Sequence, residues 1–531
     1  MTEPMRKETT PETAHRHDGW DDDRPQWMIA PPPGSHDERL VDNVHPPAWV
    51  NPQPAERYHL VVVGAGTAGL VTAAGAAGLG ARVALVERSL MGGDCLNVGC
   101  VPSKGVIRAA RGWQDARQAA QRFGGPQVAV DGGDDGFARA MERMRRIRAD
   151  ISHHDSAERF SGLGIDVFLG HGRLTAADTV EVDGAELRFR RAVVATGARA
   201  AAPPIPGLAE AGYRTNETIF ALRERPRRLA VVGGGPIGCE LAQSFARLGS
   251  EVTLLDMAQH VLVREDADAA ALVQRAMVAD GVVMELGVDV ESVRRDGDVV
   301  TIVFRRDGAM HEVEADELLV AVGRAPNVEG LGLEAAGVRY GAQGVEVDDR
   351  LRTTNPRIYA AGDVSSRYKF THIADAEARI VIQNALFFGR RKASDLIVPW
   401  CTYTSPEIAH VGLYEQDARE RGIEVETLTV PLDGVDRALL DGEDEGFLRL
   451  HLRKGKDEIL GATLVSAHAG ETIGEVALAM TAGVGLGAIA GVIHPYPTQA
   501  EVIKKAADRW RRGKLTPSVQ KVFGWWFRAF R

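Results

Sequence analysis

Short apolar runs that end at a glycine or an acid recur through the first two thirds of the chain. Residues 59–63 and 82–86 are rich in Val and Leu and enclose an alanine-rich segment, and residues 228–232 and 251–255 enclose another. Continuous Val/Leu runs bounded by turn residues are typical of buried strands in a parallel sheet, and the intervening segments have helical composition. The pattern predicts two α/β units of the strand–helix–strand type.

Three later apolar runs, at residues 190–194, 317–322 and 358–360, also read as buried strands. We expect them to return to the two sheets and to deliver the residues behind them to the carboxyl edge, where open α/β sheets bind ligands. An alternative for the acid in the last turn is a helix cap. The residues that follow these strands are Thr196 and Gly197, Gly323, and Gly362 and Asp363.

From residue 393 onward the pattern changes to shorter strands with charged loops, followed by two helical segments at 471–483 and 498–511. This part predicts a separate α+β domain. The fold class expected for the whole chain is therefore α/β, with two Rossmann-like dinucleotide-binding domains and a C-terminal α+β domain. The expected boundaries are 1–57, 58–200 continued by 326–392, 201–325, and 393–531.

The two ends of the chain differ from the rest. Residues 1–57 are charged and rich in proline, which predicts a disordered or extended arm pinned in places by Trp20, Trp27 and Trp49. Residues 521–531 are aromatic with basic flanks, typical either of a docked helix or of an interfacial membrane contact.

Residues 135–163 read as one long charged helix, near whose end stand His153, His154 and Asp155. A metal site is one interpretation of this cluster. A solvated or capping role is favoured because no further ligand lies nearby in the sequence, so we expect no metal ion.

Composition narrows the function classes. The 531 residues include 58 glycines, more than average usage supplies, and carry a net charge of −10, which disfavours a nucleic-acid-binding surface. Only four cysteines are present, as in a protein of a reducing compartment. With no signal-peptide pattern at the start and no apolar run of the ~18 residues that a membrane span needs, we expect a cytoplasmic protein.

Both predicted units open with a dinucleotide-binding fingerprint. In the first, the strand leads to Gly64, Gly66 and Gly69, and the next strand ends in Glu87. Such glycines allow the tight turn, the approach of a pyrophosphate and close helix–strand packing, and the acid binds a ribose hydroxyl.

The second fingerprint consists of Gly233, Gly235, Gly238 and the acid Asp256. The first glycines of the two units are 169 positions apart (233 − 64), as are the two acids (256 − 87). Two complete units predict two dinucleotides. Asp256 favours NAD(H) over NADP(H), because the nearest following base, Arg264, lies well past the strand.

Cys95 and Cys100 are separated by Leu-Asn-Val-Gly, and Gly92 and Gly93 precede them. The closed loop is too short to stabilise the fold much, which favours a redox-active pair over a structural disulfide. Pro102 suits the first turn of a helix, so Cys100 is expected near a helix N-terminus, where the thiolate is favoured. A zinc half-site and two buried apolar cysteines are the alternatives.

These motifs resemble those of the pyridine nucleotide–disulphide oxidoreductases, the flavoenzyme family of lipoamide dehydrogenase, glutathione reductase and mercuric reductase. The resemblance is carried by residues 92–104, the two fingerprints, and residues 195–197 and 360–363. It implies that the first fingerprint binds FAD and the second the nicotinamide nucleotide, and that the C-terminal domain forms a homodimer whose partner completes each active site.

The resemblance also implies roles for single residues. Cys100 is the flavin-proximal thiolate and Cys95 the outward thiol that meets the substrate. Lys104 pairs with Glu240 beside the flavin, and Asp363 holds the ribityl chain.

One position departs from the disulfide-reducing members of the family, which carry His-Pro-Thr-x-x-Glu near the end of the chain. Here Tyr496 takes the place of the histidine, with His494 two residues earlier and Glu501 at the end of the motif. Tyrosine, with a pKa of about 10, is a poor base near neutrality. Mercuric reductases carry tyrosine at this position, although this chain lacks their C-terminal cysteine pair and their N-terminal Cys-x-x-Cys domain.

The hypothesis from the sequence is a homodimeric oxidoreductase that passes electrons from NAD(P)H through FAD to the Cys95–Cys100 disulfide. The final acceptor is expected to be a soft metal ion, a small disulfide or another oxidant. The alternatives are a dihydrolipoyl dehydrogenase-like enzyme, a diaphorase or transhydrogenase that uses flavin alone, and an accessory protein held at a membrane by its tail.

Overall fold

The computed structural model describes residues 31–125 and 133–530, and its first α/β unit is built on a parallel sheet. The strand order is β3-β2-β1-β6-β18, with β4 and β5 added antiparallel along the first half of β6. The strands are β1 Tyr58–Val63, β2 Val83–Glu87, β3 Asp166–Leu169, β4 Gly172–Ala176, β5 Thr179–Val182, β6 Ala185–Val194 and β18 Ile358–Ala360.

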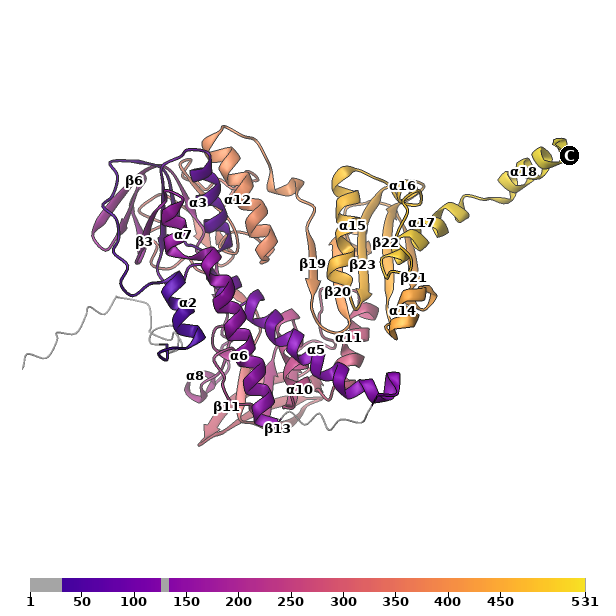
Figure 1. Cartoon of the computed structure of the whole chain (residues 1–531), viewed down its shortest axis with the longest axis horizontal. Helices are drawn as coiled ribbons and strands as arrows, with labels where there is room; N and C mark the ends of the chain where they lie inside the picture. Colours follow the sequence, from indigo (N-terminus) through magenta and orange to yellow (C-terminus); the bar gives the residue numbers. More distant parts are fainter. Residues whose placement is uncertain (1–30, 126–132, 531) are drawn as a thin grey trace, which may run out of the picture.

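The two faces of this sheet have separate cores because successive side chains of a strand point to opposite sides. Leu60 and Val62 pack toward helices α3 (Thr67–Gly78) and α12 (Thr371–Leu386), which lie side by side on one face (Figure 1). Val61 and the other β1 residues on its side of the sheet pack against β4, β5 and the loop that precedes β18. Burial on both faces explains the unbroken apolar run of β1.

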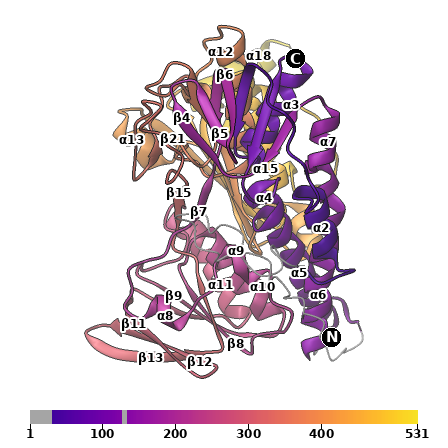
Figure 2. The same ribbon diagram turned by 90° about the vertical axis from the view of Figure 1, so that its left-hand side faces the viewer.

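The second unit repeats this plan, with a parallel sheet in the order β10-β9-β8-β14 and an antiparallel sheet β11-β12-β13. Short strands β7 (Ala198–Ala200) and β15 (Arg324–Pro326) pair where the chain passes between the two units (Figure 2). The elements are β8 Arg228–Val232, α10 Pro236–Arg247, β9 Glu251–Asp256, α11 Ala267–Ala279, β10 Val283–Leu286, β11 Asp289–Asp296, β12 Val299–Arg306, β13 Ala309–Ala315 and β14 Glu317–Val320.

Two long helices, α5 (Cys100–Phe123) and α6 (Gly133–Ser152), pack against each other beside the second unit. The single helix predicted over 135–163 is too long. The chain leaves the helix in a 3-10 turn at His153–Asp155, and a new helix, α7 (Ala157–Gly162), begins where the Ser156 hydroxyl accepts a hydrogen bond from the Arg159 N–H.

The C-terminal unit is the predicted α+β domain, with an antiparallel sheet in the order β19-β20-β23-β22-β21. Helix α15 (Ala469–Ala482) packs on β20 and β23, and α17 (Glu501–Gly513) packs on β21 (Figure 1). The strands are β19 Pro399–Thr402, β20 Glu407–Gly412, β21 Val425–Pro431, β22 Phe447–Arg453 and β23 Ile459–Ser466.

The N-terminal segment is partly helical, so the predicted extended or disordered arm is wrong for its last part. Helix α2 (His36–Val44) buries Leu40, Val41 and Val44 in the core of the first unit, and the Trp49 indole donates to the Val167 carbonyl. Trp20 and Trp27 lie outside the described residues.

The C-terminal segment forms helix α18 (Pro517–Ala529), which extends away from the rest of the molecule (Figure 1). No residue of α18 is buried, which excludes the docked helix as its state in the single chain. Among the described residues, no helix combines the length and the apolar character needed to cross a membrane.

Candidate functional site

The two cysteines of the predicted redox pair meet at the junction of two helices. Cys95 lies in the short helix α4 (Gly93–Asn97), and Cys100 is the first residue of α5. Gly99 makes this junction possible, because a Cβ there would lie 2.7 Å from the Asp94 carbonyl oxygen. Neither cysteine is in a disulfide, and the Cys100 Sγ lies 3.5 Å from the Thr371 hydroxyl at the start of α12.

The pair is electrostatically unequal. The hydrogen bond from Cys95 lowers the pKa of Cys100 to about 6 in spite of burial, aided by Thr371 and the charge of Lys104. The pKa of Cys95 is raised well above its usual range by the same hydrogen bond and by burial. These shifts favour the thiolate on Cys100 and the thiol on Cys95.

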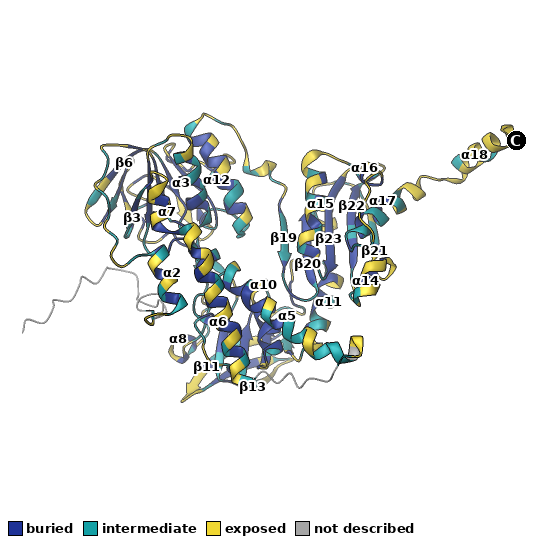
Figure 3. Ribbon diagram, viewed as in Figure 1, coloured by how far each residue is buried: buried dark blue, intermediate teal, exposed yellow. Residues whose placement is uncertain are grey.

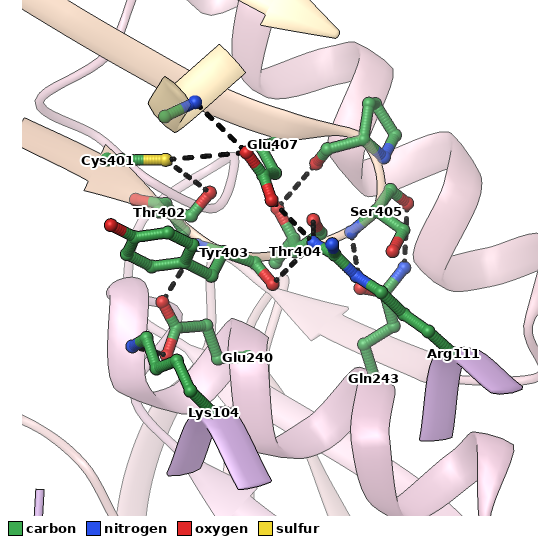
Figure 4. Close-up of polar contacts among 12 residues, drawn as sticks. Lys104, Arg111, Glu240, Gln243, Cys401, Thr402, Tyr403, Thr404, Ser405 and Glu407 are labelled. Carbon is green, nitrogen blue, oxygen red and sulfur yellow. Dashed lines mark hydrogen bonds and ion pairs between the residues drawn. The ribbon is translucent and has the colours of Figure 1, made fainter. Parts of the chain in front are cut away.

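Lys104, one turn further along α5, is held by an ion pair and an aromatic ring. Its Nζ lies 2.9 Å from Glu240 Oε2 of α10 and 4.5 Å from the centre of the Tyr403 ring (Figure 4). Burial opposes the charge of Lys104, but Glu240 outweighs that effect and raises its pKa. A permanent cation therefore lies beside the Cys100 thiolate.

The carboxylate of Glu240 also binds the C-terminal domain. Glu240 Oε1 accepts the Tyr403 N–H at 2.8 Å, while Arg111 of α5 donates to the Thr404 carbonyl and to Glu407, each at 2.9 Å (Figure 4). The redox helix is thereby fixed to the turn between β19 and β20. Sequence analysis missed this joint, because no local pattern connects residues almost 300 positions apart.

The first glycine turn fits a pyrophosphate-binding dinucleotide. A Cβ on Gly64 would lie 2.4 Å from the Ala195 carbonyl oxygen, and one on Gly69 would lie 1.8 Å from the Gly64 carbonyl oxygen. Gly66 begins α3 and faces Gly93, where a Cβ would come within 2.7 Å of the Gly66 Cα. The close backbone packing lies at the N-terminus of α3, where backbone N–H groups suit a phosphate.

Glu87 closes this turn from the end of β2. One of its oxygens accepts the Ala65 N–H at 2.7 Å and the other the Ser89 N–H at 2.8 Å. The strand order puts the acid at the carboxyl edge beside the glycines, as predicted. The residues present fit the adenosine end of FAD.

The other predicted cofactor-binding residues come from the segments 196–197 and 362–363, which follow β6 and β18 of the first sheet, and from residue 323, which follows β14 of the second sheet. The Thr196 hydroxyl donates to the Asn327 carbonyl at 2.7 Å, and Gly362, with φ +78°, donates its N–H to Glu377 Oε2 at 2.7 Å. Burial raises the pKa of Asp363 and raises that of Glu377 to about 7. Gly197 and Gly323 also have positive φ.

Arg324 is a site residue that the sequence analysis did not single out. Its guanidinium contacts Asp94, between Gly93 and Cys95, and lies 3.4 Å from Asp363 Oδ2. Arg324 therefore connects the redox helix turn to the last strand of the first sheet.

The second glycine turn repeats the geometry of the first. A Cβ on Gly233 would lie 2.6 Å from the Ala321 carbonyl oxygen, and one on Gly238 would lie 1.9 Å from the Gly233 carbonyl oxygen. Gly235 begins α10, and Asp256 accepts N–H groups from Gly234 and Ala258. This turn fits a second dinucleotide as the first one fits FAD.

The C-terminal candidates lie together, on a different unit from the cysteines. The exposed Tyr496 donates its hydroxyl to Asp436 Oδ2 at 2.8 Å, and this hydrogen bond raises the pKa of Tyr496. His494 is held inward, with Nε2 at 2.9 Å from Glu475 Oε1, and Glu501 pairs with Lys505 at 3.5 Å. Within one chain this cluster belongs to the start of α17, and the cysteines belong to α4 and α5 (Figure 1).

Helix α2 supports the redox turn from outside the predicted domains. Its Asp37 is 2% exposed and binds Arg148 at 2.8 Å and Arg223 at 3.2 Å. The other arm of Arg148 donates to the Asn97 carbonyl at 2.7 Å, at the end of the helix that carries Cys95. The buried Arg145 lies 3.7 Å from the same Asp37.

No cluster of three or more His, Cys, Asp or Glu residues in the described ranges is arranged to hold a metal ion. The imidazole rings of His153 and His154 lie 3.8 Å apart and are tilted by 41° to each other.

Comparisons with known proteins follow the same division of the chain. Residues 58–378 match the model of the pyridine nucleotide–disulphide oxidoreductases, and residues 398–507 match the dimerisation domain of that family. The second match supports a homodimer.

Curated relatives and solved structures agree with these matches. The chain is 36% identical to a mercuric reductase of Bacillus cereus, over 85% of this chain and 71% of that one. It is 33% identical to a dihydrolipoyl dehydrogenase of Geobacillus stearothermophilus, over 84% and 95%. The Cu(II) complex of the HOCl-induced flavoprotein disulfide reductase RclA from Escherichia coli superimposes with a TM-score of 0.76 at 29% identity, covering 86% of this chain and 99% of that one.

Proposed function

Because the chain belongs to the pyridine nucleotide–disulphide oxidoreductase family, we propose that it delivers electrons from NAD(P)H to a soft metal ion through the Cys95–Cys100 pair. The family uses FAD, which, when bound, accepts hydride from the nicotinamide and reduces the cysteine disulfide. Gly64, Gly66 and Glu87 would hold the FAD, and the second glycine turn with Asp256 would hold the nicotinamide nucleotide, NADH in preference to NADPH.

The observation that carries the proposal is the unequal pair of sulfurs, one thiolate and one thiol, beside a fixed cation. Cys100 remains a thiolate at neutral pH because Cys95 and Thr371 donate to it and Lys104 neutralises it. Two adjacent sulfur ligands suit a soft metal ion such as Hg(II) or Cu(II). In the overall reaction one NAD(P)H reduces one Hg(II) to Hg(0), or two Cu(II) to two Cu(I), and releases one proton.

Tyr496 favours a metal ion over an organic disulfide. Thiol–disulfide exchange needs a general base, but the Tyr496 hydroxyl donates to Asp436, which raises its pKa. His494, the alternative base, is turned toward Glu475. Binding of a metal ion by thiolates needs no such base once the thiol proton is lost. In the homodimer, the partner subunit would contribute Tyr496 and Glu501 to the site.

Among the relatives, a protein named mercuric reductase and a structure described as a Cu(II) complex are consistent with such an acceptor. A dihydrolipoyl dehydrogenase is also similar to this chain, so acceptors must be compared directly.

The test is an anaerobic NADH titration of the FAD-loaded protein, followed by steady-state rates with Hg(II), Cu(II), lipoamide and glutathione disulfide. We expect a long-wavelength thiolate–flavin absorbance in the reduced protein and turnover with the metal ions above that with the disulfides. Cys95→Ser should keep that absorbance, because Cys100 remains, but lose metal turnover. Full turnover of Cys95→Ser would show that the flavin acts alone, as in a diaphorase, and fast lipoamide turnover would assign a dihydrolipoyl dehydrogenase activity.

A further inference from the structure

Helix α18 presents large aromatic side chains to solvent. Trp525, Trp526 and Phe527 are 67%, 51% and 67% exposed, and no residue of the helix is buried (Figure 3). The helix begins at a Thr516 cap and is separated from α17 by a short turn, so it is a defined element, and none of its residues is buried by the other described residues. An apolar surface of this size on a helix marks an interaction site.

The side chains of α18 divide into two faces. Val519, Phe523, Trp526 and Phe530 follow one another at intervals of three or four residues and form one apolar stripe, to which Val522, four residues before Trp526, also belongs. The rings of Trp526 and Phe530 are 4.3 Å apart along this stripe. The opposite stripe contains the cations Lys521 and Arg528.

Charge complementarity identifies the partner. Residues 509–531 contain seven Lys or Arg and no Asp or Glu, whereas the whole chain has a net charge of −10, so residues 1–508 carry −17 (−10 − 7). Basic residues on the polar face and Trp or Phe on the other face are the features of a helix that lies in the headgroup region of an anionic bilayer. At about 1.5 Å per residue, the 13 residues of α18 are also too short to cross the ~30 Å apolar core.

We propose that α18 is an interfacial membrane helix that binds this oxidoreductase to anionic lipid surfaces. The apolar stripe enters the acyl boundary, and Lys521 and Arg528 on the opposite stripe contact lipid phosphates. The inference is independent of the electron acceptor.

The test is flotation of the FAD-loaded full chain with vesicles of phosphatidylcholine alone or mixed with phosphatidylglycerol. The protein should float with the mixed vesicles and lose binding at high salt, since the attraction is screened. Lys521→Gln combined with Arg528→Gln should weaken binding by about tenfold or more. Phe523→Ala combined with Trp526→Ala should abolish it, while Phe387→Ala, at a 56% exposed aromatic residue after α12, should not.

Two results would overturn the proposal. One is equal flotation of the wild-type protein and the Phe523/Trp526 variant, or flotation of neither. The other is a change in molar mass, measured by light scattering, from dimer to monomer when residues 517–531 are removed, because α18 would then bind a second copy of the chain. NADH-dependent turnover of every variant shows that it is folded.

Discussion

Helices α2 and α18 are the two α-helices of the described chain that lie wholly outside the family matches at residues 58–378 and 398–507, and they behave in opposite ways. Helix α2 is short, yet four of its nine residues are buried, including the charged Asp37. Helix α18 is longer and has no buried residue (Figure 3). Helix α2 is docked because it supplies something that the fold lacks, an acid for the buried Arg145 and Arg148.

The difference shows that apolar surface alone does not decide whether an added helix docks. The aromatic stripe on α18 is not covered by any part of the chain that the structure describes, whereas one carboxylate on α2 lies between three guanidinium groups. Three predictions test how far this contrast extends, beginning with the largest expected effect.

Asp37→Ala should destabilise the protein by about 3–5 kcal/mol, because two buried arginines lose their counter-charge. Unfolding of the FAD-loaded protein by urea, followed by circular dichroism, measures the effect. Asp42→Ala removes an exposed acid of the same helix and should change little. Equal behaviour of the two variants would mean that α2 is docked by its leucine and valines instead.

The second prediction concerns the ionisation of Cys100, which can be measured separately from the stability that α2 provides. Since the pKa of Cys100 is lowered to about 6, its thiolate is present above that pH and is lost as the pH falls through it. The thiolate–flavin absorbance of the reduced protein should therefore fall by half near pH 6. Lys104→Gln should move this midpoint upward by about one unit or more, because a nearby cation is lost. Asp37→Asn should leave the midpoint in place, and a wild-type midpoint near that of free cysteine, about 8.5, would contradict the assigned electrostatics.

The smallest effect is expected at the other end of the chain. Removal of residues 517–531 should change the free energy of unfolding by less than about 0.5 kcal/mol and leave turnover without vesicles unchanged, because α18 has no buried residue. The same urea titration and steady-state assay measure both. A larger loss of stability would place α18 among the docked elements and remove the contrast with α2.

The sequence predicted well what depends on local pattern. The strand over 228–232 is β8 with the same bounds, and Cys100 is the first residue of α5, as its spacing from Pro102 indicated. The twin glycine turns, with their acids, have matching hydrogen bonds because both the turn and the strand end are encoded within about 25 residues.

What failed were the features that depend on distant partners. The proline-rich charged segment at the N-terminus was predicted to be an extended or disordered arm. Its helix is held by the contact between Asp37 and Arg148, which forms only in the folded chain. Of the two interpretations of the aromatic tail, the docked helix rested on the rule that apolar residues in soluble proteins are usually covered, yet no residue of α18 is buried. Arg111, Arg324 and Glu377 carry no local signature, since each acts on the backbone or carboxylate of another element.

The contacts that join α5 and α10 to the turn after β19 affect how enzymes of this family can exchange domains. Glu240 and Arg111 bind mainly peptide groups of residues 403–404. These contacts therefore depend little on which side chains the C-terminal domain carries there. Two side chains on that side must be retained: Glu407 for its contact with Arg111, and Tyr403, whose ring lies 4.5 Å from the Lys104 Nζ. A chimaera that takes its C-terminal third from a relative can keep these contacts. Exchange of this domain could therefore change the acceptor site while Lys104 stays in place beside the redox pair.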